Sequence, residues 1–214
     1  MSTLRRLLAG FAAPALPIAE QEYSQSFFNR FNNILRLYFN RIDSTFSALL
    51  DVNGAALLNA PYGAFLSTAV QTLSAANTPT IVSLNTTQGA SGLSLASNKI
   101  TFALDGLYRV GFNLQSANAS ASIQDATVWL RKNGVDIANA AFLFTITEKH
   151  GAIDGRVDQQ AEFGFLAVAG DYIELYWAAT STQVSLYYEP AQTVPYAHPS
   201  VPSTYVTVIF ISAV

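Results

Sequence analysis

The residues best suited to catalysis are few and lie far apart in this sequence. The two histidines, His150 and His198, both lie in segments that we expect to be loops, far from any acidic cluster. A Gly-x-Ser-x-Gly motif would place a nucleophilic serine on a sharp turn, but the segment Gly89-Ala-Ser-Gly lacks that spacing. Catalytic triads assemble from distant residues, so composition alone does not exclude one. We interpret both histidines as exposed loop residues and predict that the chain is not an enzyme.

Four carboxylates are the candidates for a calcium site, because calcium is a hard cation that binds several oxygen ligands. They are Glu148, Asp154, Asp158 and Asp171. These residues fall in different predicted loops, and the chain has no Asp-x-Asp-x-Asp motif. The chain also has no cysteine, which excludes disulfides and thiolate zinc sites. We therefore expect ordinary solvated charges, with no metal and no cofactor.

Composition points to a protein whose surface is largely covered by other chains. Half of the 214 residues are hydrophobic and only 12% are charged, so a large core is possible and the surface is poor in charge. The net charge of −3 provides no basic surface for nucleic acid. No apolar run reaches the roughly 18 residues that a membrane-spanning helix requires. We predict neither a nucleic-acid partner nor a membrane span.

The segment from Leu107 to Val135 contains the clearest strand signals. Its first half places apolar side chains at every second position, which is typical of a strand with one buried face; these are Tyr108, Val110, Phe112 and Leu114. A second strand follows over 126–130 and ends at Asn133-Gly134. Both central residues of a type I′ turn need positive φ, which Asn and Gly tolerate best. The sequence therefore predicts a hairpin whose return strand begins at Val135.

Short alternating runs and turn residues continue through the C-terminal part of the chain, without a helical period. The strands that we predict lie near 65–73, 80–84, 93–96, 99–103, 107–116, 123–131, 135–146, 159–168, 172–178, 183–188 and 204–212. We expect a flexible loop at Gly89–Ser94, an irregular connection at 150–158 and a rigid proline-rich crossover at 190–202. This number and spacing of strands favours a two-sheet sandwich.

Three short segments give this part of the chain a family resemblance. They are Gly-Leu-Tyr-Arg-Val-Gly-Phe-Asn-Leu at 106–114, Val-Trp-Leu-Arg-Lys-Asn-Gly at 128–134 and Ala-Gly-Asp-Tyr-Ile-Glu-Leu-Tyr-Trp at 169–177. Together they resemble the trimeric jelly roll of complement globular heads and tumour-necrosis-factor ligands, most of all the form found on structural proteins of tailed bacteriophages. The resemblance covers residues 62–214 and implies a trimeric jelly-roll domain. Members of that family share architecture and trimerisation rather than one activity.

A long helix is predicted before this domain, over residues 20–51. Its apolar positions alternate in steps of three and four, as in the a and d positions of a coiled coil: Phe28, Phe31, Leu35, Tyr38, Ile42, Thr45 and Leu49. A single helix packed against its own domain is the alternative. The regular spacing and the bulky aromatic residues favour a bundle of several copies, and residues 52–61 form the linker to the jelly roll.

Residues 1–19 form an N-terminal arm in this interpretation. Arg5-Arg6 followed by an apolar run also imitates a short secretion signal. An apolar segment of this length cannot bury its side chains against itself. We predict that the arm docks on a virus particle or a neighbouring subunit through an apolar stripe edged by two arginines, namely Leu4, Arg5, Arg6, Leu7, Leu8 and Phe11.

Aromatic residues gather in the last three predicted strands, where neighbours such as Tyr187 and Tyr188 must point to opposite faces. In the family that the chain resembles, outward aromatics of this region pack near the threefold axis. We therefore add Tyr187 and Tyr205 to the expected trimer interface.

The sequence predicts a mainly β protein, a homotrimer with a jelly-roll head, that serves as a structural or attachment protein of a tailed-phage virion. A capsid decoration or head-fibre protein is the first expectation, because the chain is short and has no long fibrous shaft. A tail-associated fibre or receptor-binding protein is the alternative, and a secreted trimeric ligand or lectin-like module is a further one. Expected partners are further copies of the chain, other virion proteins and a host surface receptor or glycan.

Overall fold

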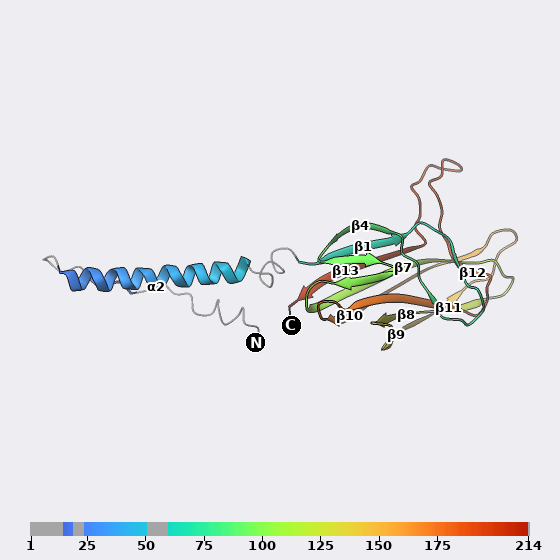
Figure 1. Ribbon diagram of the computed structural model, residues 1–214. Helices are drawn as coiled ribbons and strands as arrows, with labels where there is room; N and C mark the ends of the chain where they lie inside the picture. The colour runs from blue at the N-terminus through green and yellow to red at the C-terminus, as the bar shows by residue number, and fades with distance from the viewer. Residues whose placement is uncertain (1–14, 19–23, 51–59, 214) are drawn as a thin grey trace. The chain divides into compact units, whose positions relative to one another are not determined.

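The computed structural model describes residues 15–18, 24–50 and 60–213, with the side chains of residues 48–50 left aside. The chain divides between Asn59 and Ala60 into two compact units, which are described separately. The first contains one helix in its described part, and the second contains two antiparallel sheets (Figure 1). The prediction of a mainly β jelly-roll sandwich preceded by a helix is confirmed.

Helix α2 spans Gln25–Leu50. Ser24 is not helical; its side-chain oxygen accepts a hydrogen bond from the backbone N–H of Phe27 at 3.2 Å. A serine in this position satisfies one of the free N–H groups of the first turn, so it marks where a helix starts. The predicted start at residue 20 lies outside the described residues, and the described helix begins at Gln25, directly after this cap. No described helix is both long and apolar enough to cross a membrane.

The sandwich consists of two sheets, one of seven strands and one of six. The first, called sheet A here, contains β1 (Tyr62–Ser67), β2 (Gln71–Thr72), β4 (Thr86–Ser91), β7 (Gly106–Asn118), β10 (Gly155–Ala167), β12 (Val184–Leu186) and β13 (Thr204–Ser212). The second, sheet B, contains β3 (Thr80–Ile81), β5 (Leu93–Ala96), β6 (Lys99–Phe102), β8 (Gln124–Lys132), β9 (Val135–Ile146) and β11 (Tyr172–Ala179).

Strand β7 lies in the interior of sheet A, as its alternating pattern suggested. Its partners are β10 along one edge, and β13 followed by β12 along the other. Beyond β13, the order continues through β1 to β4. In sheet B, β11 has a corresponding place, with β8 and then β9 on one side and β6 and β3 on the other. Most strands that pair directly with β7 and β11 are thus far from them in sequence, as in a jelly roll.

The core lies between the two sheets and is rich in aromatic rings. Tyr108 of β7 packs against Phe102 and Phe210 with ring centroids 4.6 and 5.3 Å apart. The four alternating residues from Tyr108 to Leu114 are all buried, which confirms the predicted inward face of this strand. The hydroxyl of Tyr108 donates to the carbonyl of Leu104 at 2.8 Å, so the ring stays buried without an unpaired polar atom.

Several turns and loops test the sequence interpretation directly. Asn133 and Gly134 have φ values of 51° and 81°, and they join β8 to β9; the predicted type I′ hairpin is confirmed. The expected flexible loop at Gly89–Ser94 was wrong. Residues 86–91 form β4, and a turn at Gly92 leads into β5. The apolar content of this stretch is low, so its pairing with β1 gave no period-two signal.

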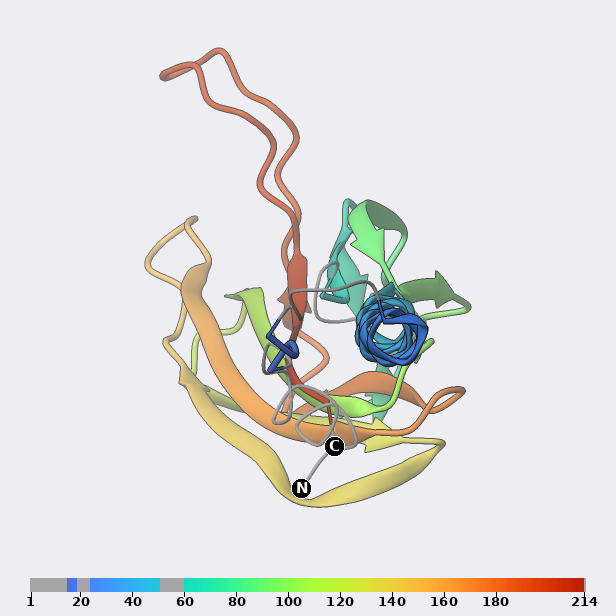
Figure 2. The same ribbon diagram turned by 90° about the vertical axis from the view of Figure 1, so that its left-hand side faces the viewer.

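The proline-rich segment differs from the predicted crossover. It doubles back as a narrow hairpin closed by two isolated bridges, Glu189 with Val201 and Gln192 with His198, and it has a cis peptide bond before Pro195. This hairpin stands clear of both sheets in either view (Figures 1 and 2). Residues 150–158 also differ from expectation, because β10 begins at Gly155.

Candidate subunit interface

The outer face of sheet A is formed by alternate residues of four neighbouring strands, β1, β13, β7 and β10. Their register places the side chains in rows across the sheet. One row contains Leu66, Tyr205, Asn113 and Gln160; the next contains Ala64, Thr207, Gly111 and Glu162; the third contains Tyr62, Ile209, Arg109 and Gly164. Because side chains alternate along a strand, all of these residues face away from the core.

One end of this face carries apolar side chains that no described residue covers. Tyr62 and Ile209 are direct cross-strand partners, and each is about half exposed; Ile211 is likewise exposed two residues further along β13. Leu166 of β10 is exposed at the same end of the sheet, opposite Leu107. Adjacent exposed apolar side chains of this size are typical of a surface that another protein covers.

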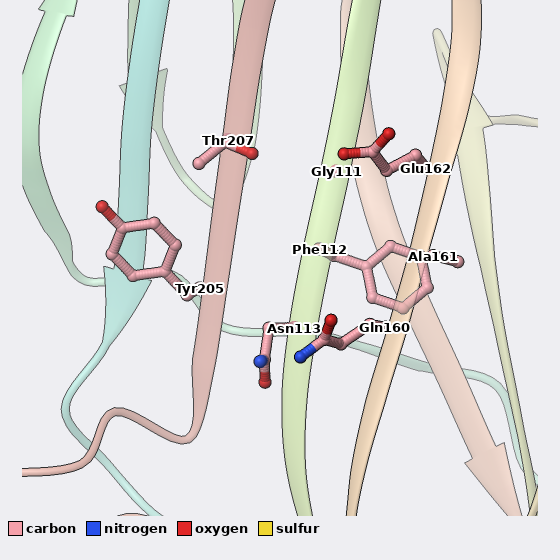
Figure 3. Close-up of a pocket in the computed structure, with 8 residues that line it drawn as sticks. All are labelled: Gly111, Phe112, Asn113, Gln160, Ala161, Glu162, Tyr205 and Thr207. Atoms are coloured by element: carbon pink, nitrogen blue, oxygen red, sulfur yellow. The ribbon is translucent and has the colours of Figure 1, made fainter.

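A hollow of about 380 Å³ lies in the middle of the face. Its centre is Gly111, which leaves a gap in its row; a Cβ atom there would lie 3.1 Å from the hydroxyl oxygen of Thr207. Figure 3 shows the side chains around the gap, which come from three strands: Asn113, Gln160, Glu162, Tyr205 and Thr207. The hollow combines hydrogen-bonding groups with one aromatic ring, so it can receive a side chain of mixed character from a partner.

Asp158 organises the polar end of the face. Its carboxylate accepts hydrogen bonds from the amides of Gln115 at 3.0 Å, Gln160 at 3.1 Å and Asn113 at 3.2 Å. Hydrogen bonds to a charged acceptor are stronger than neutral ones. The three amide side chains are therefore held in place rather than free to rotate, and the surface that they present is rigid.

The remaining charges on this face are paired. Arg109 lies 3.9 Å from Glu162, and Arg156 lies 3.7 Å from Glu189 while its guanidinium sits 4.1 Å from the ring centroid of Tyr187. These are half-exposed pairs, each worth at most about 1 kcal/mol in stability. Because these charges are paired, the face as a whole presents little net charge to a partner.

The structure brings together Tyr187 and Tyr205, the two head residues that the sequence assigned to a trimer interface. Tyr205 points outward from β13 and Tyr187 follows β12, whose strand pairs with the far end of β7. The backbone N–H of Tyr187 donates to the carbonyl of Gln115 at 2.6 Å, which continues this pairing by one residue. Both tyrosines thus belong to sheet A, at its Asp158 end.

The predicted helix residues lie along one side of α2. The helix turns once in about 3.6 residues, which aligns Phe28, Phe31, Leu35, Tyr38 and Ile42 on one face. The last four are partly covered, Phe28 is 44% exposed, and Thr45 is buried. Leu49 falls within α2, but its side chain lies outside the described residues. The arm residues Leu4, Arg5, Arg6, Leu7, Leu8 and Phe11 also lie outside them.

Phe46, which the sequence places beside the predicted stripe of α2 together with Phe27 and Ile34, is more than half exposed. Phe39 is also more than half exposed beside this stripe, and the sequence analysis did not name it. Tyr62, Gly111 and Ile209 were likewise not assigned to the interface. A signal was present in the last strand, because residues 204–211 are apolar or small in both phases of the alternation. Such a pattern favours a strand that is covered on both faces, as in parallel sheets.

The candidate catalytic and metal-binding residues do not come together. Nδ1 of His198 lies 2.7 Å from the carbonyl of Pro199, and His150 pairs through its backbone with Ile153. Asp158 binds the three amides described above, whereas Asp171 pairs with Lys132 at 2.6 Å. In the described part of the chain, no three histidine or acidic side chains gather closely enough to hold a metal ion.

Comparison of the sequence with models of protein families found no matching family. Comparison with curated proteins also found no match. The fold and its surfaces are therefore the basis on which a function is proposed.

Proposed function

We propose that this chain is a non-enzymatic structural and attachment protein of a tailed-phage virion, and that it works as a homotrimer. The observation that carries the proposal is the outer face of sheet A, where Tyr62, Ile209 and Ile211 are exposed together on neighbouring strands of a jelly roll. Burial of apolar surface stabilises an assembly by about 25 cal/mol per Å². Three copies packed through this face would cover the apolar end and keep the paired charges at the rim.

Helix α2 supports the same arrangement. Its described residues include an apolar stripe that is wider than a two-stranded seam, because Phe39 and Phe46 lie beside the predicted positions. A wide stripe suits a bundle of more than two helices. We infer that the helices of the three chains form a bundled stem.

The parts of the chain support a proposal for the place of the protein in the virion. Capsid decoration or a head fibre is the proposed role, with other virion proteins as partners through the arm at residues 1–19. The tail-associated or receptor-binding alternative is favoured by one feature, the hairpin at 189–201, which projects from the sandwich and exposes Val194 and Tyr196.

Sedimentation velocity on two variants tests the role of the face. Ile209→Glu places a charge on the proposed interface and should convert trimers to monomers at micromolar concentration. Ile153→Glu is the matched control, because Ile153 is 69% exposed in the turn before β10 and lies outside the face. Equal assembly of the two variants would exclude the outer face of sheet A as the interface.

The virion assignment has its own test. An antibody against the purified chain, imaged by electron microscopy on intact phage that carry the gene, should label the capsid. Label on the tail would favour the receptor-binding alternative. Failure to label any particle, with the protein found free in the lysate, would contradict a virion role.

A further inference from the structure

A second surface of the head, on the outer face of sheet B, carries an ordered pair of aromatic side chains. Trp129 of β8 lies directly opposite Tyr176 of β11, and their ring centroids are 5.9 Å apart with planes inclined by 33°. Trp129 is partly exposed, whereas Trp177, the other tryptophan of the chain, is completely buried. The core therefore uses one tryptophan, and the other faces solvent.

Polar contacts hold the exposed indole in place. Its Nε1–H donates a hydrogen bond of 2.8 Å to Asp136 of β9, which also binds Nε of Arg131. The guanidinium of Arg131 lies 3.9 Å from the ring centroid of Tyr176 and covers that ring. Arg131, followed by the indole N–H, holds the pKa of Asp136 below its usual range. The tryptophan is thus oriented in advance, which lowers the entropic cost of binding a ligand.

A hollow of about 200 Å³ occupies the next positions along the same face. Small side chains at Thr127 and Ala178 leave it open, and these two residues are cross-strand partners. Thr127 is two residues from Trp129 on β8, a separation of about 7 Å along a strand. The aromatic pair and the hollow are therefore adjacent parts of one surface, on the side-by-side strands β8, β9 and β11 (Figure 1).

The rim of the hollow combines one apolar group with unused polar atoms. Leu143 of β9 is 70% exposed. Asp125 uses Oδ1 to accept a hydrogen bond from Thr145 at 2.9 Å, and its Oδ2 has no partner within the described ranges. Asn77 donates its backbone N–H to the carbonyl of Ala179 at 2.8 Å, and its exposed side-chain amide makes no hydrogen bond to any described residue. A carboxylate oxygen and an amide are thus available to a ligand.

The size and chemistry of this surface indicate one class of ligand. Pockets for drug-sized molecules usually have volumes of about 300–1,000 Å³, so this hollow fits a single ring unit. A protein partner would need roughly 800 Å² of surface, and Leu143 supplies the one large apolar side chain among the described residues of the rim. A sugar ring has an apolar C–H face and a rim of hydroxyls, and it matches an aromatic ring beside hydrogen-bonding groups.

We propose that Trp129 and the adjacent hollow between β8, β9 and β11 form a saccharide-binding site, with the indole contacting a sugar ring and Asp125 and Asn77 binding its hydroxyls. This site lies on the opposite sheet from the candidate subunit interface, so all copies in an assembly could bind saccharide at once. The inference goes beyond the proposed structural role and does not depend on a virion location.

Tryptophan fluorescence tests the proposal directly, because the chain contains only Trp129 and the buried Trp177. The full-length chain is titrated with maltopentaose, cellopentaose, mannopentaose and chitopentaose at millimolar concentration, and quenching by acrylamide is measured. At least one sugar should protect Trp129 from the quencher. Trp129→Phe leaves only the signal of Trp177, which should not respond to any sugar.

Two variants locate the site. Ala178→Leu fills the hollow from the outer face and should weaken the binding of the protective sugar at least tenfold, with an unchanged melting temperature. Val168→Ala shortens an apolar side chain that is 56% exposed in the turn before β11, at the opposite end of that strand from Ala178, and it should leave binding unchanged. Absence of protection by all four sugars, or protection that persists in Ala178→Leu, would overturn the proposal. A change of oligomeric state in Ala178→Leu would do so too, since it would make this face a subunit contact.

Discussion

The hydroxyl of Tyr205 donates a hydrogen bond of 2.7 Å to Oε1 of Gln88. Tyr205 belongs to β13 and Gln88 to β4, and β1 lies between these strands in sheet A. The tyrosine side chain therefore extends across β1 on the outer face of the sheet. This contact holds the ring at the edge of the Gly111 hollow, where a neighbouring chain would meet it.

Tyr205→Ala should weaken assembly without unfolding the head. An aromatic residue at the centre of an interface often contributes about 2 kcal/mol or more to binding, so we expect the dissociation constant to rise roughly thirtyfold. Sedimentation equilibrium measures this change. Tyr196→Ala is the control, because this exposed tyrosine lies on the hairpin rather than on the sheet. Equal dissociation constants for the two variants would show that Tyr205 lies outside the interface.

Gly134→Val should destabilise the head by about 1–3 kcal/mol, because Gly134 has a φ of 81° that a β-branched residue adopts only with strain. Thermal unfolding followed by circular dichroism provides the measurement. Gly164→Val is the control: this residue lies in β10 with open space around its Cβ position, and its φ is not positive. The turn would have no special requirement for glycine if both variants melted together.

Asp171 should make the free energy of unfolding of the head depend on pH in the acidic range. The ion pair with Lys132, helped by hydrogen bonds from the backbone N–H of Val168 and from Asn133, lowers the pKa of Asp171 to about 2. A carboxyl whose pKa is lower in the folded state stabilises the fold above the unfolded pKa of 3.8. That contribution is lost as the pH falls from about 4 toward 2.

Asp171→Asn removes this charge. As the pH falls from about 5 to about 2, the variant should therefore lose less stability than the parent protein. At neutral pH the variant should be less stable by about 1–2 kcal/mol, since hydrogen bonds to a charged group are lost. Asp154→Asn, at an exposed position just before β10, is the control at neutral pH and should be about as stable as the parent there. Parallel curves for Asp171→Asn and the parent would contradict the role of this ion pair. Chemical denaturation at several pH values decides between the outcomes.

Gln159→Met should raise the stability of the head. Gln159 is buried on the inner face of β10 opposite Leu114, and neither its Nε2 nor its Oε1 has a partner among the described residues. A buried polar group without a hydrogen bond costs about 1–3 kcal/mol, and methionine fills a similar volume. We expect the melting temperature to rise by a few degrees, while Gln183→Met, in the exposed turn before β12, leaves it nearly unchanged. A lower melting temperature for Gln159→Met would mean that the amide is satisfied in solution.

Much of the fold could be predicted from local pattern. The alternation of Tyr108, Val110, Phe112 and Leu114 identified β7, because one face of this strand is buried and the other wet. Asn133-Gly134 identified the hairpin, because few other residue pairs accept two positive φ values. Each of these signals is contained within a few consecutive residues, so it can be read from the sequence.

The rest of the architecture depends on contacts between distant segments. Strand β4 has small and polar residues, and it is a strand because it pairs with β1 about 25 residues earlier in the chain. The start of α2 could not be read from the apolar spacing, because the first position of that spacing, Phe28, lies after the capping Ser24. The hollow at Gly111 could not be foreseen either, because its rim comes from β7, β10 and β13.

The molar mass of the full-length protein in solution shows whether the chain forms a homotrimer. Light scattering coupled to gel filtration should give three times the monomer mass of 23.0 kDa across micromolar concentrations. Ile209→Glu should lower this value, and Ile153→Glu should not. A protein that remains at 23.0 kDa over the whole concentration range would contradict the account, because the exposed face of sheet A and the apolar stripe of α2 would then have no partner copy.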